Sequence, residues 1–253
     1  MHALYIDDSN KDKVVAIDGP SGSGKSTVAK LVAKKMNVTH IDTGAMFRAV
    51  AYYLNNKRFF LPEYKIDSVR GELEDKEKNL MCRIALEDIS KFKLDYEYQN
   101  GNLLLSVNEE DISLKIREHN ISDLASKVSK LSYVRTLLLN FQRELVKNVV
   151  AVMEGRDIGT VVFPNASCKI FLTASLEVRA QRRLNDLRST GNNIITLEEL
   201  YQDVKLRDEE DSKRAIAPLK KADDAFLLDS SQMSLDQVVN TIVDHATISL
   251  NKN

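Results

Sequence analysis

Residues 19–26 read Gly-Pro-Ser-Gly-Ser-Gly-Lys-Ser, and this match to G-x-x-x-x-G-K-[ST] restricts the fold of the 253-residue chain more than any other feature. An apolar run ends at Asp18 and a helical pattern starts at Thr27, which is the strand–loop–helix context of a phosphate-binding loop (P-loop). Glycines let backbone amides approach phosphate oxygens, and the helix start adds unpaired N–H groups and a positive dipole end. We expect Lys25 to neutralise β- and γ-phosphates and Ser26 to hold a metal ion. The alternative is a Gly-rich strand-to-helix turn that binds nothing, but it would not explain a lysine at the crowded start of the helix. The expected phosphate contacts are Gly19, Pro20, Ser21, Gly22, Ser23, Gly24, Lys25, Ser26 and Thr27.

Short apolar runs bounded by turn residues predict buried parallel strands. They cover residues 14–18, 38–41, 149–153, 168–172 and 226–229. Helical spacing follows at residues 26–36 and 176–188, and Thr196 with Glu199 forms a capping box for a helix that runs to about Lys213. Ser234 is expected to cap the last helix. Strands that alternate with helices predict an α/β fold with a doubly wound, five-stranded parallel sheet, whose ligands lie at the carboxyl ends of the strands.

Residues 61–115 follow a different pattern and predict an inserted small antiparallel β subdomain. Apolar and aromatic residues alternate with polar ones from Phe92 to Tyr98, and Asn100-Gly101 supplies a two-residue hairpin turn before Leu103. Residues 121–146 return to helical periodicity. We therefore expect a flexible N-terminus (1–12), a P-loop core (13–60 and 116–253) with a helical lid at about 179–214, and the insert (61–115) as the monophosphate-binding subdomain.

The overall charge is balanced, with 36 basic and 37 acidic side chains, so no bulk attraction to nucleic acid or membrane is indicated. The chain has no run of 18 apolar residues and no leader-like start, which favours a soluble cytoplasmic protein. Cys82 and Cys168 lie in unrelated contexts, so neither zinc nor a disulfide is suggested.

A P-loop alone would suit a motor, a switch, a transporter subunit or a small-molecule kinase. The sequence has no Asn-Lys-x-Asp base reader of switch GTPases, and no second signature or Asp-Glu strand end of transport ATPases. Arginines instead collect at strand ends and in the late helices, as two polyanionic substrates that meet head to head would require. They are Arg48, Arg135, Arg156, Arg179, Arg182, Arg183, Arg207 and Arg214.

Four stretches, in this order and spacing, resemble the bacterial cytidylate kinases of the nucleoside monophosphate kinase family. They are residues 17–22 (IDGPSG), 42–48 (DTGAMFR), 154–164 (EGRDIGTVVFP) and 214–219 (RAIAPL). The resemblance covers nearly the whole chain, including the inserted hairpin subdomain. Glu154 stands where some members have Asp, and Thr43 where others have Ser; both departures keep the functional group.

The resemblance implies a site for CMP that is built from several parts of the chain. Thr43, Ser126, Arg135 and Asp157 would surround the base, and Asp157 would accept from its exocyclic amino group. Arg207 and Asp211 would hold the ribose, and Arg48, Arg156 and Arg214 the acceptor phosphate. The assignments of Ser126 and Arg135 come from the resemblance alone.

The spacing of Arg207, Asp211 and Arg214 agrees with this site, because intervals of four and three residues put them on one helix face. A solvated salt-bridge ladder is the alternative for the same spacing. Arg179, Arg182 and Arg183 flank residues 189–193, and at least one could reach the transferring phosphoryl group. The catalytic residues expected are Lys25, Arg156, Arg182 and Arg207.

The implied reaction is transfer of the γ-phosphoryl group of ATP, with Mg²⁺, to CMP and to dCMP, which gives CDP or dCDP and ADP. A kinase of broader specificity for UMP and CMP is one alternative, and a non-catalytic nucleotide-sensing module is another. We expect a monomer with small-molecule partners only.

Overall fold

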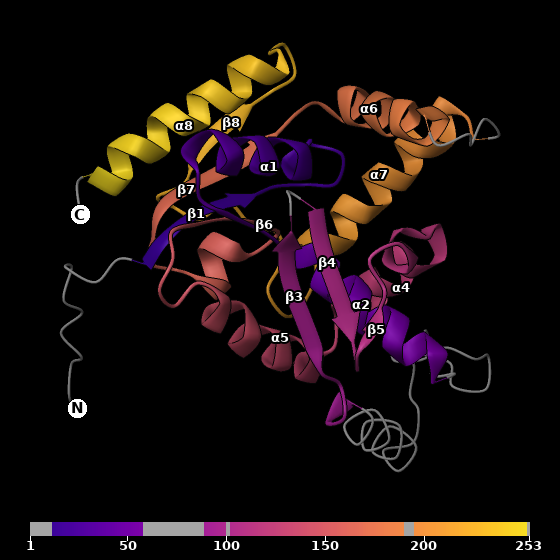
Figure 1. The fold of residues 1–253 in the computed structure, drawn as a ribbon. Helices are drawn as coiled ribbons and strands as arrows, with labels where there is room; N and C mark the ends of the chain where they lie inside the picture. Colours follow the sequence, from indigo (N-terminus) through magenta and orange to yellow (C-terminus); the bar gives the residue numbers. More distant parts are fainter. Residues whose placement is uncertain (1–11, 58–88, 100–101, 190–194, 252–253) are drawn as a thin grey trace, which may run out of the picture. The chain divides into compact units, whose positions relative to one another are not determined.

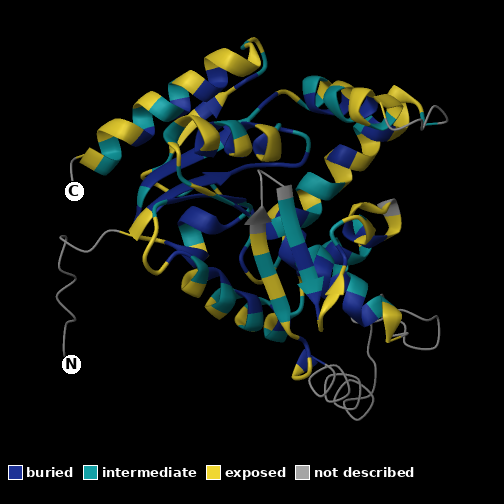
Figure 2. Ribbon diagram, in the orientation of Figure 1, coloured by how far each residue is buried: buried dark blue, intermediate teal, exposed yellow. Residues whose placement is uncertain are grey.

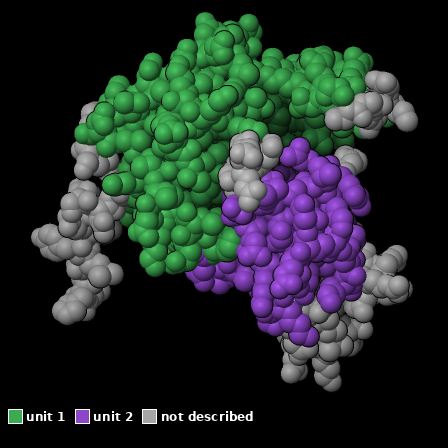
Figure 3. Space-filling model, viewed as in Figure 1, with its two compact units in different colours: residues 1–43, 141–253 green, residues 44–140 purple. Residues whose placement is uncertain are grey.

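The computed structural model describes residues 12–57, 89–99, 102–189 and 195–251 (Figure 1). The chain divides into two units, residues 1–43 with 141–253 (unit 1) and residues 44–140 (unit 2), which Figure 3 colours green and purple. The predicted insert, residues 61–115, falls within the bounds of unit 2. Its residues 61–88, Cys82 among them, lie outside the described residues, as do the hairpin turn at 100–101, residues 1–11 and the stretch 190–194 of the predicted lid.

Unit 1 contains the predicted five-stranded parallel sheet, in the order β2-β6-β1-β7-β8. The strands are β1 (Asp12–Asp18), β2 (Thr39–Asp42), β6 (Ala151–Gly155), β7 (Ala166–Thr173) and β8 (Phe226–Asp229). β1 lies in the middle, and Val14 to Ile17 are almost fully buried because strands flank both edges and both faces are covered. β6 begins later than its apolar pattern predicts, since Val149 is 42% exposed and lies before the strand.

One face of the sheet packs against α1 (Lys25–Met36) and α8 (Leu235–Asn251). Val28 and Val32 of α1 and Ile242 of α8 join a core cluster with Ile17 and Ile170. In Figure 2 the sheet-facing sides of these helices are dark and the outer side of α8 is exposed. Since Ile170 points to this face, the next residue back, Lys169, points to the other face.

The other face carries a single π-helical turn, η4 (Ile158–Val162), which contacts β1, β6 and β7. The position of Gly159 in this turn lies against Lys169, since a Cβ there would be 3.1 Å from Lys169 Cδ. Ile158 is fully buried, and Val162 is almost so. η4 thus places the residues just before it, Arg156 and Asp157, at the carboxyl edge of the sheet.

Two further helices of unit 1, α6 (Leu176–Ser189) and α7 (Leu197–Ser212), pack against each other. The predicted capping box begins α7: Thr196 Oγ1 accepts from the Glu199 amide, and Glu199 accepts from the Thr196 amide at 2.8 Å. The predicted cap of α8 is also present, because Ser234 Oγ accepts from the Gln237 amide at 3.2 Å. Local sequence therefore sets both helix starts.

Unit 2 contains the predicted hairpin, in which β3 (Leu94–Gln99) pairs with β4 (Asn102–Val107) in antiparallel register, with Gln99 opposite Asn102. A short third strand, β5 (Glu110–Asp111), extends the sheet and was not predicted. α2 (Thr43–Asn56), which starts at the last residue of unit 1, and the 3-10 turn η3 (Lys115–Arg117) were not located from the sequence either.

The helical periodicity of residues 121–146 belongs to two helices, α4 (His119–Val128) and α5 (Ser132–Leu145), rather than one. The Ser129 hydroxyl donates to the Ser126 carbonyl at 2.8 Å, so a side chain takes a backbone acceptor near the end of α4. Among the described helices of both units, none is long and apolar enough to cross a membrane.

Candidate active site

The P-loop leaves β1 at Asp18 and enters α1 at Lys25, as the motif predicts. Gly19 is required by close approach, because a Cβ there would lie 2.0 Å from the Leu172 carbonyl oxygen of β7. Gly24 has a φ of 87°, a left-handed conformation that only glycine adopts easily. The loop therefore turns tightly above the sheet and presents the first amides of α1.

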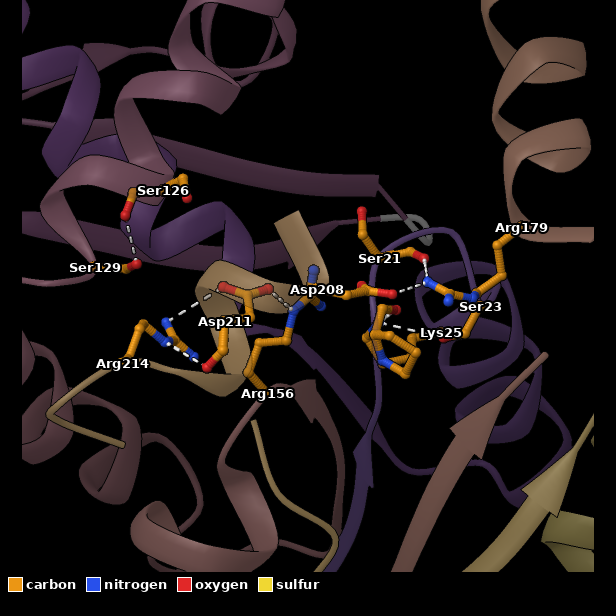
Figure 4. A network of polar contacts seen from close by, with 11 residues as sticks. Ser21, Ser23, Lys25, Ser126, Ser129, Arg156, Arg179, Asp208, Asp211 and Arg214 are labelled. Atoms are coloured by element: carbon orange, nitrogen blue, oxygen red, sulfur yellow. Dashed lines mark hydrogen bonds and ion pairs between the residues drawn. The ribbon is translucent and has the colours of Figure 1, made fainter. Parts of the chain in front are cut away.

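Lys25 lies inside this turn and is 7% exposed. Its ammonium donates to the Pro20 carbonyl at 2.6 Å and to Ser23 Oγ at 3.3 Å (Figure 4). Burial is the main reason that the pKa of Lys25 lies well below its usual range, and the charge of Arg156 lowers it further. An anion beside this ammonium would favour its protonated form, so the environment suits a bound phosphate.

Two arginines of α6 hold the backbone of the P-loop. Arg179 is buried and donates to the Ser21 carbonyl at 3.0 Å and to the carboxylate of Asp208 on α7. Arg182 donates to the Ser23 carbonyl at 3.2 Å and to Ser230, just after β8. Both side chains, which were predicted to flank a lid, thus tie α6 to the loop.

Ser26, the predicted metal ligand, donates its hydroxyl to Glu154 Oε2 at 2.7 Å. The other oxygen of this carboxylate lies 3.1 Å from Nε2 of His40 on β2, and both side chains are almost fully buried. Mg²⁺ prefers oxygen ligands and is usually held by one or two carboxylates together with substrate phosphates. The donor set therefore fits Mg²⁺, although no cluster of three His, Cys, Asp or Glu side chains occurs in the described part of the chain.

Asp157 lies in the segment between β6 and η4, and the side chain of Asp18 is hydrogen-bonded to the residues that follow it. The buried carboxylate of Asp18 accepts from the Ile158 amide at 2.8 Å and from the Gly159 amide at 2.7 Å. Burial raises the pKa of Asp18 to about 6, although these two hydrogen bonds act to lower it. The carbonyl of Asp157 accepts from the amides of Val161 and Val162.

The carboxylate of Asp211 forms ion pairs with two of the arginines predicted to bind the acceptor phosphate, Arg156 and Arg214. Arg156 Nε donates to Asp211 Oδ2 at 2.8 Å, and Arg214 Nη1 lies 3.8 Å from Asp211 Oδ1; Figure 4 shows both side chains pointing toward the carboxylate. Burial acts to raise the pKa of Asp211, but the charges of Arg156, Arg214 and Arg207 outweigh it and the pKa is lowered. The ionised Asp211 therefore holds a positively charged cluster.

The prediction that one helix face carries Arg207, Asp211 and Arg214 was wrong for Arg214. α7 ends at Ser212, so Arg214 lies beyond its C-terminus. Its side chain still returns to the last turn, where Nε donates to the Asp211 carbonyl at 3.3 Å. Intervals of four and three residues place side chains together only where the helix continues through all of them.

The remaining predicted site residues divide between the units. Thr43 belongs to unit 1, where its hydroxyl donates to the Glu154 carbonyl at 2.7 Å. Arg48 of α2, Ser126 of α4 and Arg135 of α5 belong to unit 2. There Arg135 donates to the Ser129 carbonyl at 3.1 Å, and Ser129 also bonds to Ser126, which brings these two predicted base contacts together. The guanidinium of Arg135 also lies 5.4 Å from the ring centroid of Phe47, the neighbour of Arg48.

Sequence reasoning missed three residues that shape this site, namely Asp18, His40 and Asp208. Asp18 could have been found, because a carboxylate that ends an apolar strand needs hydrogen-bond partners if it is buried. His40 and Asp208 carry no such signal. Their contacts depend on which strands and helices become neighbours.

Comparison with known proteins gives one consistent result. The cytidylate kinase family model matches residues 15–248. A cytidylate kinase of Pseudothermotoga lettingae is 42% identical over 229 residues, which cover 90% of this chain and 92% of the relative. Cytidylate kinases of Fusobacterium nucleatum and Thermotoga maritima are 44% and 43% identical, each over 90% of this chain and 94% of the relative.

Proposed function

Because the chain belongs to the cytidylate kinase family, we propose that it transfers the γ-phosphoryl group of ATP to the 5'-phosphate of CMP and dCMP. The products are CDP or dCDP and ADP. The observation that carries this proposal is a second cationic cluster beside the P-loop. Arg156 directly follows Gly155 of β6, which lies opposite Asp18 of β1. The positive charge of Arg156 lowers the pKa of Lys25, so the two cations are close to each other. Two anions bound there would meet at one edge of the sheet.

The proposed mechanism needs no general base, because the attacking oxygen belongs to a phosphate that is already ionised. The protein positions the two nucleotides and stabilises charge on a loose transition state. Lys25 lies on the donor side, and Arg156, with Arg207 and Arg214 around Asp211, lies on the acceptor side. Arg182 adds positive charge next to Gly24. Ser26 and Glu154 would hold Mg²⁺ together with the substrate phosphates, and the ion would supply neutralisation of phosphate charge.

Asp157 is proposed to select cytosine. A carboxylate gains a hydrogen bond from the exocyclic amino group of cytosine, whereas the carbonyl of uracil would place two acceptors opposite each other. Thr43, Ser126 and Arg135 are proposed as further base contacts, Arg207 and Asp211 as ribose contacts, and Arg48 as a phosphate contact.

An acceptor panel tests the proposed function. ADP release from Mg·ATP is measured with CMP, dCMP, UMP, AMP and GMP at equal concentrations. We expect CMP and dCMP to give the highest kcat/KM, and ATP binding without acceptor-dependent ADP release would refute kinase activity. Equal rates with UMP and CMP would identify a pyrimidine kinase of broader specificity.

Asp157→Ala tests the base assignment in the same assay. The variant should lose the preference for CMP over UMP as well as rate, because the amino group loses its acceptor. Unchanged selectivity would show that the base is read by other residues.

A further inference from the structure

Asp18 is a buried carboxylate for which the proposed mechanism has no use. It ends β1, is 5% exposed and directly precedes the P-loop. Both of its oxygens are occupied by backbone amides of a distant segment, those of Ile158 at 2.8 Å and Gly159 at 2.7 Å. A group that is costly to bury and is fully hydrogen-bonded fixes the segment that it contacts.

The contacted segment begins directly after Asp157. Ile158 and Gly159 are the first two residues of η4, whose initial amides have no partner within the turn. Asp18 supplies an anionic acceptor for both, while the Asp157 carbonyl accepts from Val161 at 2.9 Å and from Val162 at 3.2 Å. Hydrogen bonds therefore fix the backbone on the C-terminal side of Asp157, both at its own carbonyl and at the amides of the next two residues.

The same residue is tied to the donor side of the site. Asp18 is covalently linked to Gly19, where no Cβ fits against Leu172 of β7. In the parallel register Asp18 lies opposite Gly155, the residue before Arg156. One residue thus connects the start of the P-loop with the segment that carries Arg156 and Asp157.

We infer that Asp18 is a positioning residue for base selection, which holds the Asp157 carboxylate in the orientation that accepts from cytosine. This inference rests on the proposed function. It predicts that loss of the Asp18 carboxylate impairs recognition of the acceptor base far more than binding of ATP, although Asp18 is the neighbour of the P-loop.

Asp18→Asn is the test variant, because it keeps the side-chain shape and presents an N–H donor to one of the two amides. Asp12→Asn, the same change at the exposed start of β1, is the matched control. KM and kcat are measured with CMP and with UMP at saturating ATP, and with ATP at saturating CMP. Far-UV circular dichroism shows whether each variant is folded.

We expect Asp18→Asn to raise the KM for CMP about tenfold or more and to reduce the ratio of kcat/KM for CMP over UMP by about the same factor. The KM for ATP should change less than about threefold, and Asp12→Asn should match the wild type in every parameter. Equal effects on both substrates, or an unchanged CMP over UMP ratio, would overturn the inference. A wild type that does not phosphorylate CMP would instead refute the proposed function.

Hydrogen exchange on the wild type gives a second measurement that needs no variant. If the contacts of Asp18 support acceptor binding, CMP should slow exchange of the Ile158 and Gly159 amides more than a non-hydrolysable ATP analogue does. No effect of CMP on these amides would also overturn the inference.

Discussion

The pKa of Asp18 predicts an unusual dependence of stability on pH. Its folded-state pKa is raised from 3.8 to about 6, with burial as the largest cause. The folded protein therefore binds this proton more tightly than the unfolded chain does. Between about pH 4 and 6 the contribution of Asp18 to the free energy of unfolding rises as the pH falls and is lost as the pH rises through about 6.

The size of this effect follows from the two pKa values. The full shift corresponds to about 3 kcal/mol. Between pH 7.5 and 4.5, where the unfolded carboxyl is still mostly ionised, the contribution of Asp18 should rise by about 2 kcal/mol. Carboxylates with lowered pKa values, such as Asp211, act in the opposite direction, since they lose stabilising charge as the pH falls. Asp18 must therefore be isolated by a variant.

The assay compares urea unfolding of the wild type and Asp18→Asn at pH 7.5, 6.0, 5.0 and 4.5, followed by far-UV circular dichroism because the chain has no tryptophan. The stability difference, wild type minus variant, should rise by about 2 kcal/mol toward the lowest pH. Asp12→Asn should show no such trend against the wild type. A difference that stays constant within about 0.5 kcal/mol would refute the reasoning, because Asp18 would then titrate alike in both states.

Three further substitutions test other parts of the site. Lys25→Ala should reduce kcat about a hundredfold or more, because the transferring phosphoryl group loses a positive charge. The melting temperature should not fall, because the variant no longer has to bury an ammonium group. Near-normal turnover would refute the role of Lys25 in binding phosphate. Asp211→Asn should destabilise the protein by about 3 kcal/mol in urea unfolding, since Arg156 and Arg214 lose their buried anion. The exposed ion pair between Glu209 and Lys213, the residue that follows α7, offers a control, and Glu209→Gln should change stability by less than about 1 kcal/mol. Equal effects of the two substitutions would contradict the assignment of Asp211 as a buried anion. Arg179→Lys should raise the KM for ATP about tenfold, because an ammonium cannot replace the forked guanidinium donors to Ser21 and Asp208. Arg188→Lys, the same change at an exposed position of α6, should leave the KM for ATP unchanged. Identical kinetics of the two variants would argue against a role of Arg179 in supporting the P-loop.

The parts of the fold that the sequence predicted are those encoded by neighbouring residues. The strand before Gly19, the helix after it, the Thr196 capping box and the hairpin around residues 100–101 each depend on a few consecutive positions. The break between α4 and α5 was not predictable from periodicity, because apolar residues such as Val128 and Leu131 keep helical spacing through it.

The sequence indicates candidate site residues, whose roles stay predictions, but it does not indicate the contacts between them. Ser26 and Glu154 were both singled out in motifs, but their hydrogen bond joins residues 128 positions apart and exists only because β6 lies next to β1. The bonds from Asp18 to Ile158 and Gly159 depend on the same neighbourhood. Periodicity shows which face of an element is buried, whereas such contacts require the order of the strands.

The central place of β1 in the sheet also sets an order of events during synthesis. β1 is the first described strand to leave the ribosome, yet its partners β6 and β7 start only at Ala151 and Ala166. At about 5 to 20 residues per second, the apolar run of β1 remains without its sheet neighbours for a time on the order of 10 s. Such non-local pairing is slow, so the nascent chain exposes Val14 to Ile17 until most of its length has been made. The strand order therefore leaves this apolar segment without its sheet partners during most of the synthesis of the chain.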